Sequence, residues 1–166
     1  MTLTNRVALS GLQVIDPQKW IESQFCSVFD VALGLERGML LREKEFRLFL
    51  MEQEWSSFAE RDVALFCSTP ALLPAWTYIL VGRYLVEVSA RPFLGTEHEL
   101  RIQLAINQIR NEDFSAFHDQ RIILKSCGGD QSGQLGLALL ERLQPIARSI
   151  MFGEPCSTVP IFKKGA

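Results

Sequence analysis

Three short apolar segments, each of which runs into a cysteine, constrain the fold of this chain more than any other feature. They span residues 62–68, 121–128 and 148–156, and their cysteines are Cys67, Cys127 and Cys156. Apolar runs of this length are typical of buried β-strands. If the three strands lie parallel in one sheet, their thiols meet at its carboxyl edge, where ligand sites collect in open α/β folds.

Helical segments separate these strands. Apolar residues at helical spacing, a capping box and flanking prolines predict helices within residues 41–53, 70–88, from residue 96 onward, and over 134–144. Strands that alternate with such helices indicate βαβ crossovers. We therefore predict an α/β fold with a mostly parallel sheet and helices on both of its faces. The two strands expected nearest the N-terminus, residues 7–15 and 28–35, could be antiparallel additions to this sheet.

Composition limits the class of protein. Apolar residues make up 48% and charged residues 22% of the 166 residues, and the formal net charge is −2. This is ordinary soluble-globular composition without the basic excess that would indicate a nucleic-acid partner. No Pro- or Ser-rich linker interrupts the chain, so we expect one domain over residues 1–166, large enough to bury a core without disulfides.

The four cysteines and the N-terminus indicate a cytoplasmic protein with reduced thiols. Four cysteines spread along 166 residues do not resemble a secreted disulfide framework. The first residues lack the charged start and apolar run of a signal peptide. The apolar stretch 70–88 contains Arg83 and Glu87 and begins among prolines, so we expect a buried helix there and no membrane span.

One pattern occurs twice. Residues 55–65 resemble residues 114–124, and each residue of the first copy lies 59 positions before its counterpart, as Trp55 and Phe114 do. In both copies aromatic residues three apart are followed by a polar turn and an apolar strand. Duplication would explain the pattern, but we favour similar demands on similar connections, because repeat architectures usually need three or more units.

Several stretches resemble an uncharacterised bacterial family, domain of unknown function 2480. The resemblance spans nearly the whole chain, and the run Gly153 to Pro160 is its most specific part. The family pattern includes cysteines that match Cys67, Cys127 and Cys156, whereas Cys26 lies outside it. The other matching stretches are residues 5–8, 38–47, 67–68, 74–76, 125–128 and 149–152. The family has no assigned activity, so the resemblance implies no mechanism.

Three thiols at one sheet edge could hold a soft metal. Zinc and iron–sulfur centres prefer thiolate ligands, and a closed tetrahedral site needs a fourth ligand. Asp130, Glu154 or a water could supply it, whereas His98 and His118 fit less well. The leading hypothesis from the sequence is therefore a metal-binding protein with Cys67, Cys127 and Cys156 as ligands.

Two other interpretations stay open. In the first, the cysteines are small buried apolar residues, as free cysteines commonly are, and the chain is a structural or interaction module. In the second, Cys156 carries redox or nucleophilic chemistry, with a thiolate stabilised by nearby hydroxyl and N–H groups. The sequence leaves open whether the chain is an enzyme. It permits a homodimer, and it identifies no protein partner.

Overall fold

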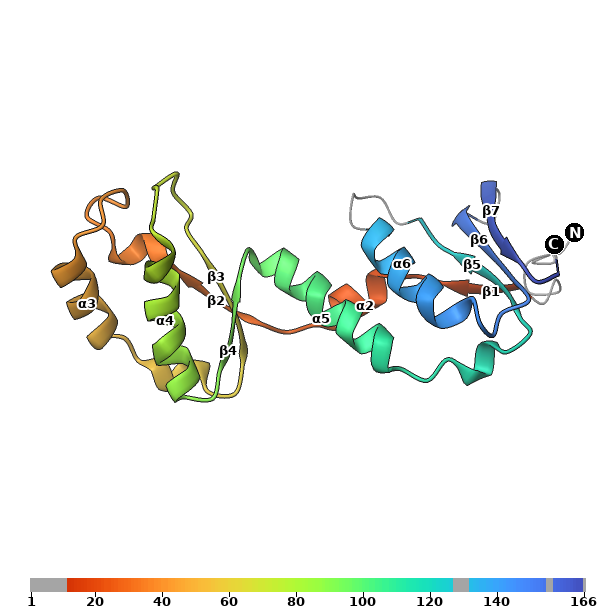
Figure 1. The fold of residues 1–166 in the computed structure, drawn as a ribbon, viewed down its shortest axis with the longest axis horizontal. Helices are drawn as coiled ribbons and strands as arrows, with labels where there is room; N and C mark the ends of the chain where they lie inside the picture. The colour runs from red at the N-terminus through yellow and green to blue at the C-terminus, as the bar shows by residue number, and fades with distance from the viewer. Residues whose placement is uncertain (1–11, 127–131, 155–156, 166) are drawn as a thin grey trace, which may run out of the picture. The chain divides into compact units, whose positions relative to one another are not determined.

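The computed structural model describes residues 12–126, 132–154 and 157–165, which form a mixed α/β structure (Figure 1). The chain divides into two compact units. One is Phe25–Arg101, and the other combines Met1–Gln24 with Ile102–Ala166. Each unit contains its own sheet, so the predicted α/β class with mostly parallel strands is confirmed and the expectation of one sheet is wrong. That residues 1–166 fold as one domain stays a prediction.

The 25–101 unit contains a sheet of three parallel strands in the order β2-β3-β4. The helices α3 and α4 pack against one face of this sheet, where Phe46 and Leu50 of α3 and Val81 and Leu85 of α4 are buried with Val63 of β3. The elements are β2 (Ser27–Asp30), η1 (Val31–Gly34), α3 (Glu43–Met51), η2 (Trp55–Phe58), β3 (Asp62–Phe66), α4 (Ala75–Glu87) and β4 (Arg91–Leu94).

The second unit contains a four-stranded sheet in the order β1-β5-β6-β7. Its first three strands are parallel, and only β7 runs antiparallel to its neighbour β6. Ile122 of β5, Ile150 of β6, Ile109 of α5 and Leu139 of α6 are buried in its core. The elements are β1 (Leu12–Ile15), α2 (Gln18–Glu22), α5 (Glu97–Asn111, whose first turn belongs to the other unit), η3 (Ser115–Phe117), β5 (Arg121–Leu124), α6 (Ser132–Leu143), β6 (Ser149–Glu154) and β7 (Ser157–Lys163).

The sequence repeat corresponds to a repeated helix–turn–strand connection. In one unit η2 leads through a turn into β3, and in the other η3 leads through a turn into β5. Glu60 and Asp119 hold the same place in the two turns, with φ angles of 61° and 56°. Left-handed backbone is uncommon for residues other than glycine, so its occurrence at both positions shows that the two turns share one geometry.

The correspondence extends to the strands on either side. In each unit the central strand, β3 or β5, pairs in parallel with an earlier strand and a later one. An aspartate lies at the end of the earlier strand in both units. Asp30 ends β2, and its carboxylate accepts the Ala32 N–H at 3.0 Å. Asp16, directly after β1, accepts the Gln18 N–H at 3.1 Å in the same way. Both carboxylates end a strand by capping the turn that follows it.

The strands differ in three places from those that the sequence indicated. The strand expected over residues 28–35 ends at Asp30, because the carboxylate caps η1. The antiparallel strand is β7, near the C-terminus, whereas β1 pairs in parallel with β5 and β2 in parallel with β3. Between the helices expected within residues 70–88 and from residue 96 onward, the structure has the strand β4, which the sequence did not predict.

Pro92 is tolerated in β4 because of the direction in which it faces. Arg91 N–H donates to the Arg61 carbonyl at 2.8 Å and Gly95 N–H to the Leu65 carbonyl at 2.9 Å, so residues 91, 93 and 95 face β3. Residues 92 and 94 then face the outer edge of the sheet. The proline therefore removes no hydrogen bond from the β3–β4 ladder, which is the edge placement that strands allow.

The core of the 25–101 unit can be tested with two leucines of one helix. Leu50 of α3 is fully buried, whereas Leu48 is 59% exposed. We expect Leu50→Ala to lower the free energy of unfolding by about 2–5 kcal/mol and Leu48→Ala by less than about 1 kcal/mol. Urea unfolding followed by circular dichroism measures both, and equal losses would contradict the packing of α3.

Candidate functional site

Cys67 lies at the carboxyl edge of the three-stranded sheet, directly after β3. Its Sγ is 3.3 Å from the Thr69 hydroxyl, which in turn donates to the Gly38 carbonyl. The side chain is partly buried and packs against the core of the unit. The polar partner of this thiol is thus a neutral hydroxyl, which offers no positive charge to stabilise a thiolate.

A carboxylate and a phenol lie at the same edge. Burial would raise the pKa of Asp30, but hydrogen bonds from Ser68 and Ala32 outweigh it and lower this pKa below its ordinary value. The Ser68 N–H donates to Asp30 Oδ1 at 3.0 Å. Burial raises the pKa of Tyr78, and the neighbouring Cys67 and Asp30 raise it further. Asp30 is therefore ionised and Tyr78 protonated at neutral pH, and the carboxylate stabilises the loop after β3.

The strands that precede the three predicted metal ligands do not share one sheet. Cys67 follows β3, whereas Cys127 follows β5 and Cys156 follows β6, and these two strands belong to the other sheet. Cys67 therefore does not share a sheet edge with the ends of β5 and β6, because β3 pairs with neither strand. Cys127 and Cys156 themselves lie outside the described residues.

The additional ligands that the sequence suggested lie on other elements of the chain than Cys67. Asp130 lies outside the described residues, and Glu154 ends β6, opposite Ser157 of β7. His98 is exposed in the first turn of α5, and His118 follows η3. Within residues 12–126, 132–154 and 157–165, no three His, Cys, Asp or Glu side chains are grouped so that they could hold a metal ion.

Cys26, which lies outside the family pattern, sits in a different environment from Cys67. Its Sγ lies 3.9 Å from the carbonyl oxygen of Glu97. Burial raises the pKa of this thiol, and a hydrogen bond with Arg101 only partly offsets the rise. The thiol is therefore protonated at neutral pH, as expected for a cysteine that contributes packing.

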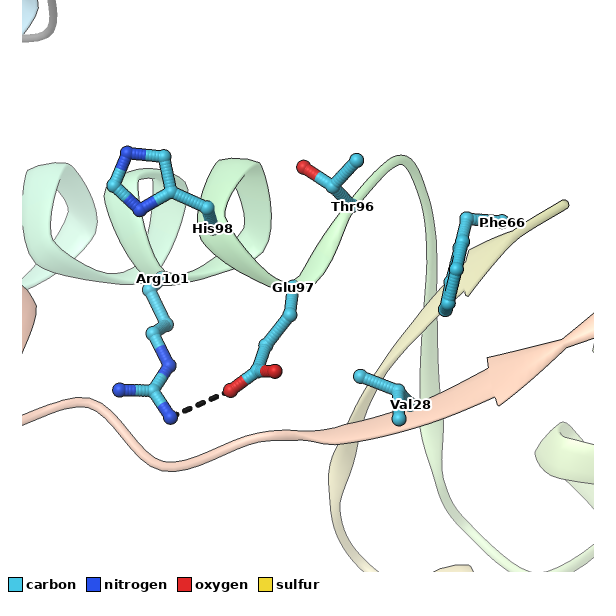
Figure 2. A pocket seen from close by; sticks show the side chains of 6 residues that line it. All are labelled: Val28, Phe66, Thr96, Glu97, His98 and Arg101. Carbon is cyan, nitrogen blue, oxygen red and sulfur yellow. Dashed lines mark hydrogen bonds and ion pairs between the residues drawn. The ribbon is translucent and has the colours of Figure 1, made fainter. Parts of the chain in front are cut away.

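A pocket of about 550 Å³ lies where the first turn of α5 meets the sheet face opposite α3 and α4 (Figure 2). Val28 of β2 and Phe66 of β3 line it from the sheet. Glu97 and Arg101 point toward each other across it and form an ion pair at 2.6 Å, so their charges offset one another. The pocket therefore has an apolar floor and an ion pair across it, while the buried Arg101 Nε has no hydrogen-bond partner among the described residues.

The predicted capping box closes the N-terminus of α5 beside this pocket. Glu99 Oε2 accepts the Thr96 N–H at 2.7 Å, and the Glu99 N–H donates to Thr96 Oγ1 at 3.3 Å. The hydrogen bonds from Thr96 lower the pKa of Glu99. A carboxylate of the chain itself thus occupies the place in which a helix N-terminus would bind an anion.

The sequence did not predict the apolar groove between α4 and β4, which we call the α4–β4 groove. Its volume is about 720 Å³, and its sides are Ile79, Gly82 and Val86 of α4 and Leu65, Pro92 and Leu94 of the strands. Ile79 is 71% exposed, Val86 61% and Leu94 65%. Large apolar side chains that are gathered and exposed in this way mark sites of interaction.

The expectation that residues 70–88 form a buried helix is therefore wrong for one side of α4. Val81 and Leu85 are buried, but Ile79 and Val86 face outward. The apolar residues of this helix surround it, so no polar face in the sequence marked the exposed side. None of the helices in the described part of the chain is long and apolar enough to cross a membrane.

One comparison with known proteins identifies a family. The family model described as protein of unknown function (DUF2480) matches residues 1–164. The chain belongs to the DUF2480 family. No curated protein and no solved structure matches it. Membership in the DUF2480 family confirms the resemblance seen in the sequence motifs and assigns no activity, while a bacterial origin stays a prediction.

The Asp30 carboxylate predicts a pH dependence of stability. A pKa that is lowered in the folded state contributes stability above the ordinary value of 3.8, and this contribution is lost as the pH falls through the lowered pKa. We expect Asp30→Asn to lower the free energy of unfolding by about 1 kcal/mol at pH 7. The difference between the two proteins in urea unfolding should shrink as the pH falls below 3.8, and a difference that stays constant throughout the acid range would contradict the assignment.

Proposed function

We propose that this chain is an interaction module that binds a helix of a protein partner in the α4–β4 groove. The groove is the most apolar exposed surface described above, and it lies between a helix and the outer edge of a sheet. The proposal corresponds to the interpretation of the sequence in which the cysteines only pack. The partly buried Cys67, bonded to a neutral hydroxyl, and the protonated Cys26 both support that interpretation.

The observation that carries the proposal is Pro92 on the outer edge of β4. At the equivalent place in the other unit, Ile150 of β6 pairs with Phe162 of β7. The Arg148 carbonyl, on the same side of β6 as Ile150, accepts the Lys164 N–H at 3.0 Å. That edge is thus covered by a strand, whereas β4 ends its sheet among the described residues.

A strand could not cover β4 in the same way. Pro92 has no N–H to donate, and a proline on an edge strand blocks pairing with a further strand. The groove beside β4 must therefore be filled by side chains. A helix supplies such side chains along one face, which is the helix-in-groove mode of recognition.

The spacing of residues along α4 also supports a helical partner. Ala75, Ile79, Gly82 and Val86 follow one another at intervals of four, three and four residues along the exposed side of the helix. This is the spacing of the contact positions in coiled coils, at which side chains of two helices interdigitate.

The surface can be probed with the apolar dye bis-ANS at low protein concentration. We expect Ile79→Glu to lower the dye fluorescence at least about twofold, because a charge in the middle of the groove interrupts its apolar surface. Leu48→Glu is the matched control, since Leu48 is an exposed leucine on a helix of the same unit outside the groove. Equal effects of the two substitutions, or no effect of Ile79→Glu, would overturn the proposal.

The three-cysteine metal site stays a prediction with a direct test. Protein purified without affinity tags or chelators would contain about one zinc or iron centre per chain if Cys67, Cys127 and Cys156 bind a metal. The packing interpretation predicts no bound metal and an unchanged metal content in Cys67→Ser, measured by inductively coupled plasma mass spectrometry. Stoichiometric metal that is lost in Cys67→Ser would favour the metal site instead.

A further inference from the structure

We propose that the helix in the α4–β4 groove belongs to a second copy of this chain, and that two copies pair through antiparallel α4 helices that cross at Gly82. The inference rests on the proposed function and names its partner. It uses the exposed side of α4, the glycine at its centre and the charges along its rim. The first provides apolar contacts between two identical surfaces, and the other two allow those surfaces to approach each other.

The residues of the groove are placed almost symmetrically about Gly82. Ile79 lies three residues before it and Val86 four residues after it, and both are more than half exposed. If two antiparallel helices cross at Gly82, Ile79 of each copy meets Val86 of the second copy. The same apolar contact then forms twice, as a two-fold interface requires.

Gly82 leaves space where the helices would cross. A Cβ at this position would lie 3.8 Å from Pro92 Cγ, which is an ordinary contact, so the packing of α4 on β4 does not require glycine. Glycine in a helix interior costs about 1 kcal/mol relative to alanine. Its absent side chain opens the groove between Ile79 and Val86 and allows a second backbone to approach closely.

The charges beside the groove do not oppose pairing of two identical surfaces. Arg83 Nη2 and Glu87 Oε1 form an ion pair at 2.8 Å within α4, and the Arg83 guanidinium lies 5.0 Å from the centre of the Tyr84 ring. The two exposed charges offset each other. Two copies of a groove rimmed by one sign of charge would repel each other. Because the charges on this rim offset each other, a second copy can approach without that repulsion.

The size of the surface sets the expected affinity. One helix of 13 residues and the edge of a four-residue strand make a small interface, of the class that forms weak complexes. We therefore expect a dissociation constant on the order of 10 μM, so that the dimer dominates at about 100 μM and the monomer at about 1 μM.

Sedimentation equilibrium of the full chain tests the dimer. At about 100 μM the weight-average mass of the unmodified chain should approach twice the 18.8 kDa mass of one copy, and Ile79→Glu should keep it at the mass of one copy. Leu48→Glu should leave the dimer intact. A monomer at 100 μM whose groove still binds bis-ANS would overturn the second copy as partner and leave the proposed function standing. A monomer without dye binding would overturn both proposals. A dimer that Ile79→Glu does not weaken would overturn this inference alone.

Substitutions at Gly82 separate folding from association. Gly82→Ala should raise the midpoint of thermal unfolding at low protein concentration, because it favours the helix, yet weaken the dimer several-fold by holding the helices apart. Gly82→Leu should fill the groove and abolish the dimer. A dimer that Gly82→Leu leaves at full strength would contradict the crossing at this residue.

A mixture of two variants tests which residues meet. Ile79→Glu and Val86→Lys should each be monomeric at 100 μM, because each places unpaired charges in the interface. In an equimolar mixture the introduced carboxylate faces the introduced ammonium, and the other Ile79–Val86 contact is unchanged, so the dimer should return. A mixture that stays monomeric, while both variants keep their circular dichroism spectra, would overturn the antiparallel register.

Discussion

Both units of this protein depend on the parallel pairing of neighbouring strands. Two parallel strands cannot be joined by a tight hairpin, because the chain must return to the same end of the sheet. The return is made by α4 between β3 and β4 and by α6 between β5 and β6. Each helix then buries apolar residues on its sheet, so the core of each unit and the positions of the later strands follow from this requirement.

The two units differ in how the last parallel strand is covered. Around β6 the chain continues into β7, whose backbone satisfies the outer edge. Around β4 the chain turns instead into α5, and Pro92 leaves the edge without a donor at its centre. One change in connectivity after otherwise similar units thus leaves apolar side chains of α4 and β4 exposed, and this exposed surface is the basis of the proposed interaction.

The cysteine hypothesis shows where reasoning from the sequence reached its limit. Each apolar segment before a cysteine did form a strand, as its composition predicted. The hypothesis also required that the strands share a sheet, and Cys67 follows β3, which pairs in the described part of the chain with β2 and β4. Strand pairing joins residues far apart in sequence, and an apolar strand carries no mark of its partner. The α4–β4 groove was missed for a related reason, since an apolar helix does not reveal which of its sides stays uncovered.

The sequence by itself determined the local structure. Capping by Thr96 and Glu99, the aromatic turns repeated 59 residues apart and the apolar strands all act through neighbours within a few residues, so they could be predicted. The tertiary structure alone decided that there are two sheets, that β4 is an edge and that Ile79 and Val86 are exposed. Those outcomes depend on long-range packing, because it decides which segments far apart in the sequence bury their apolar surfaces against one another.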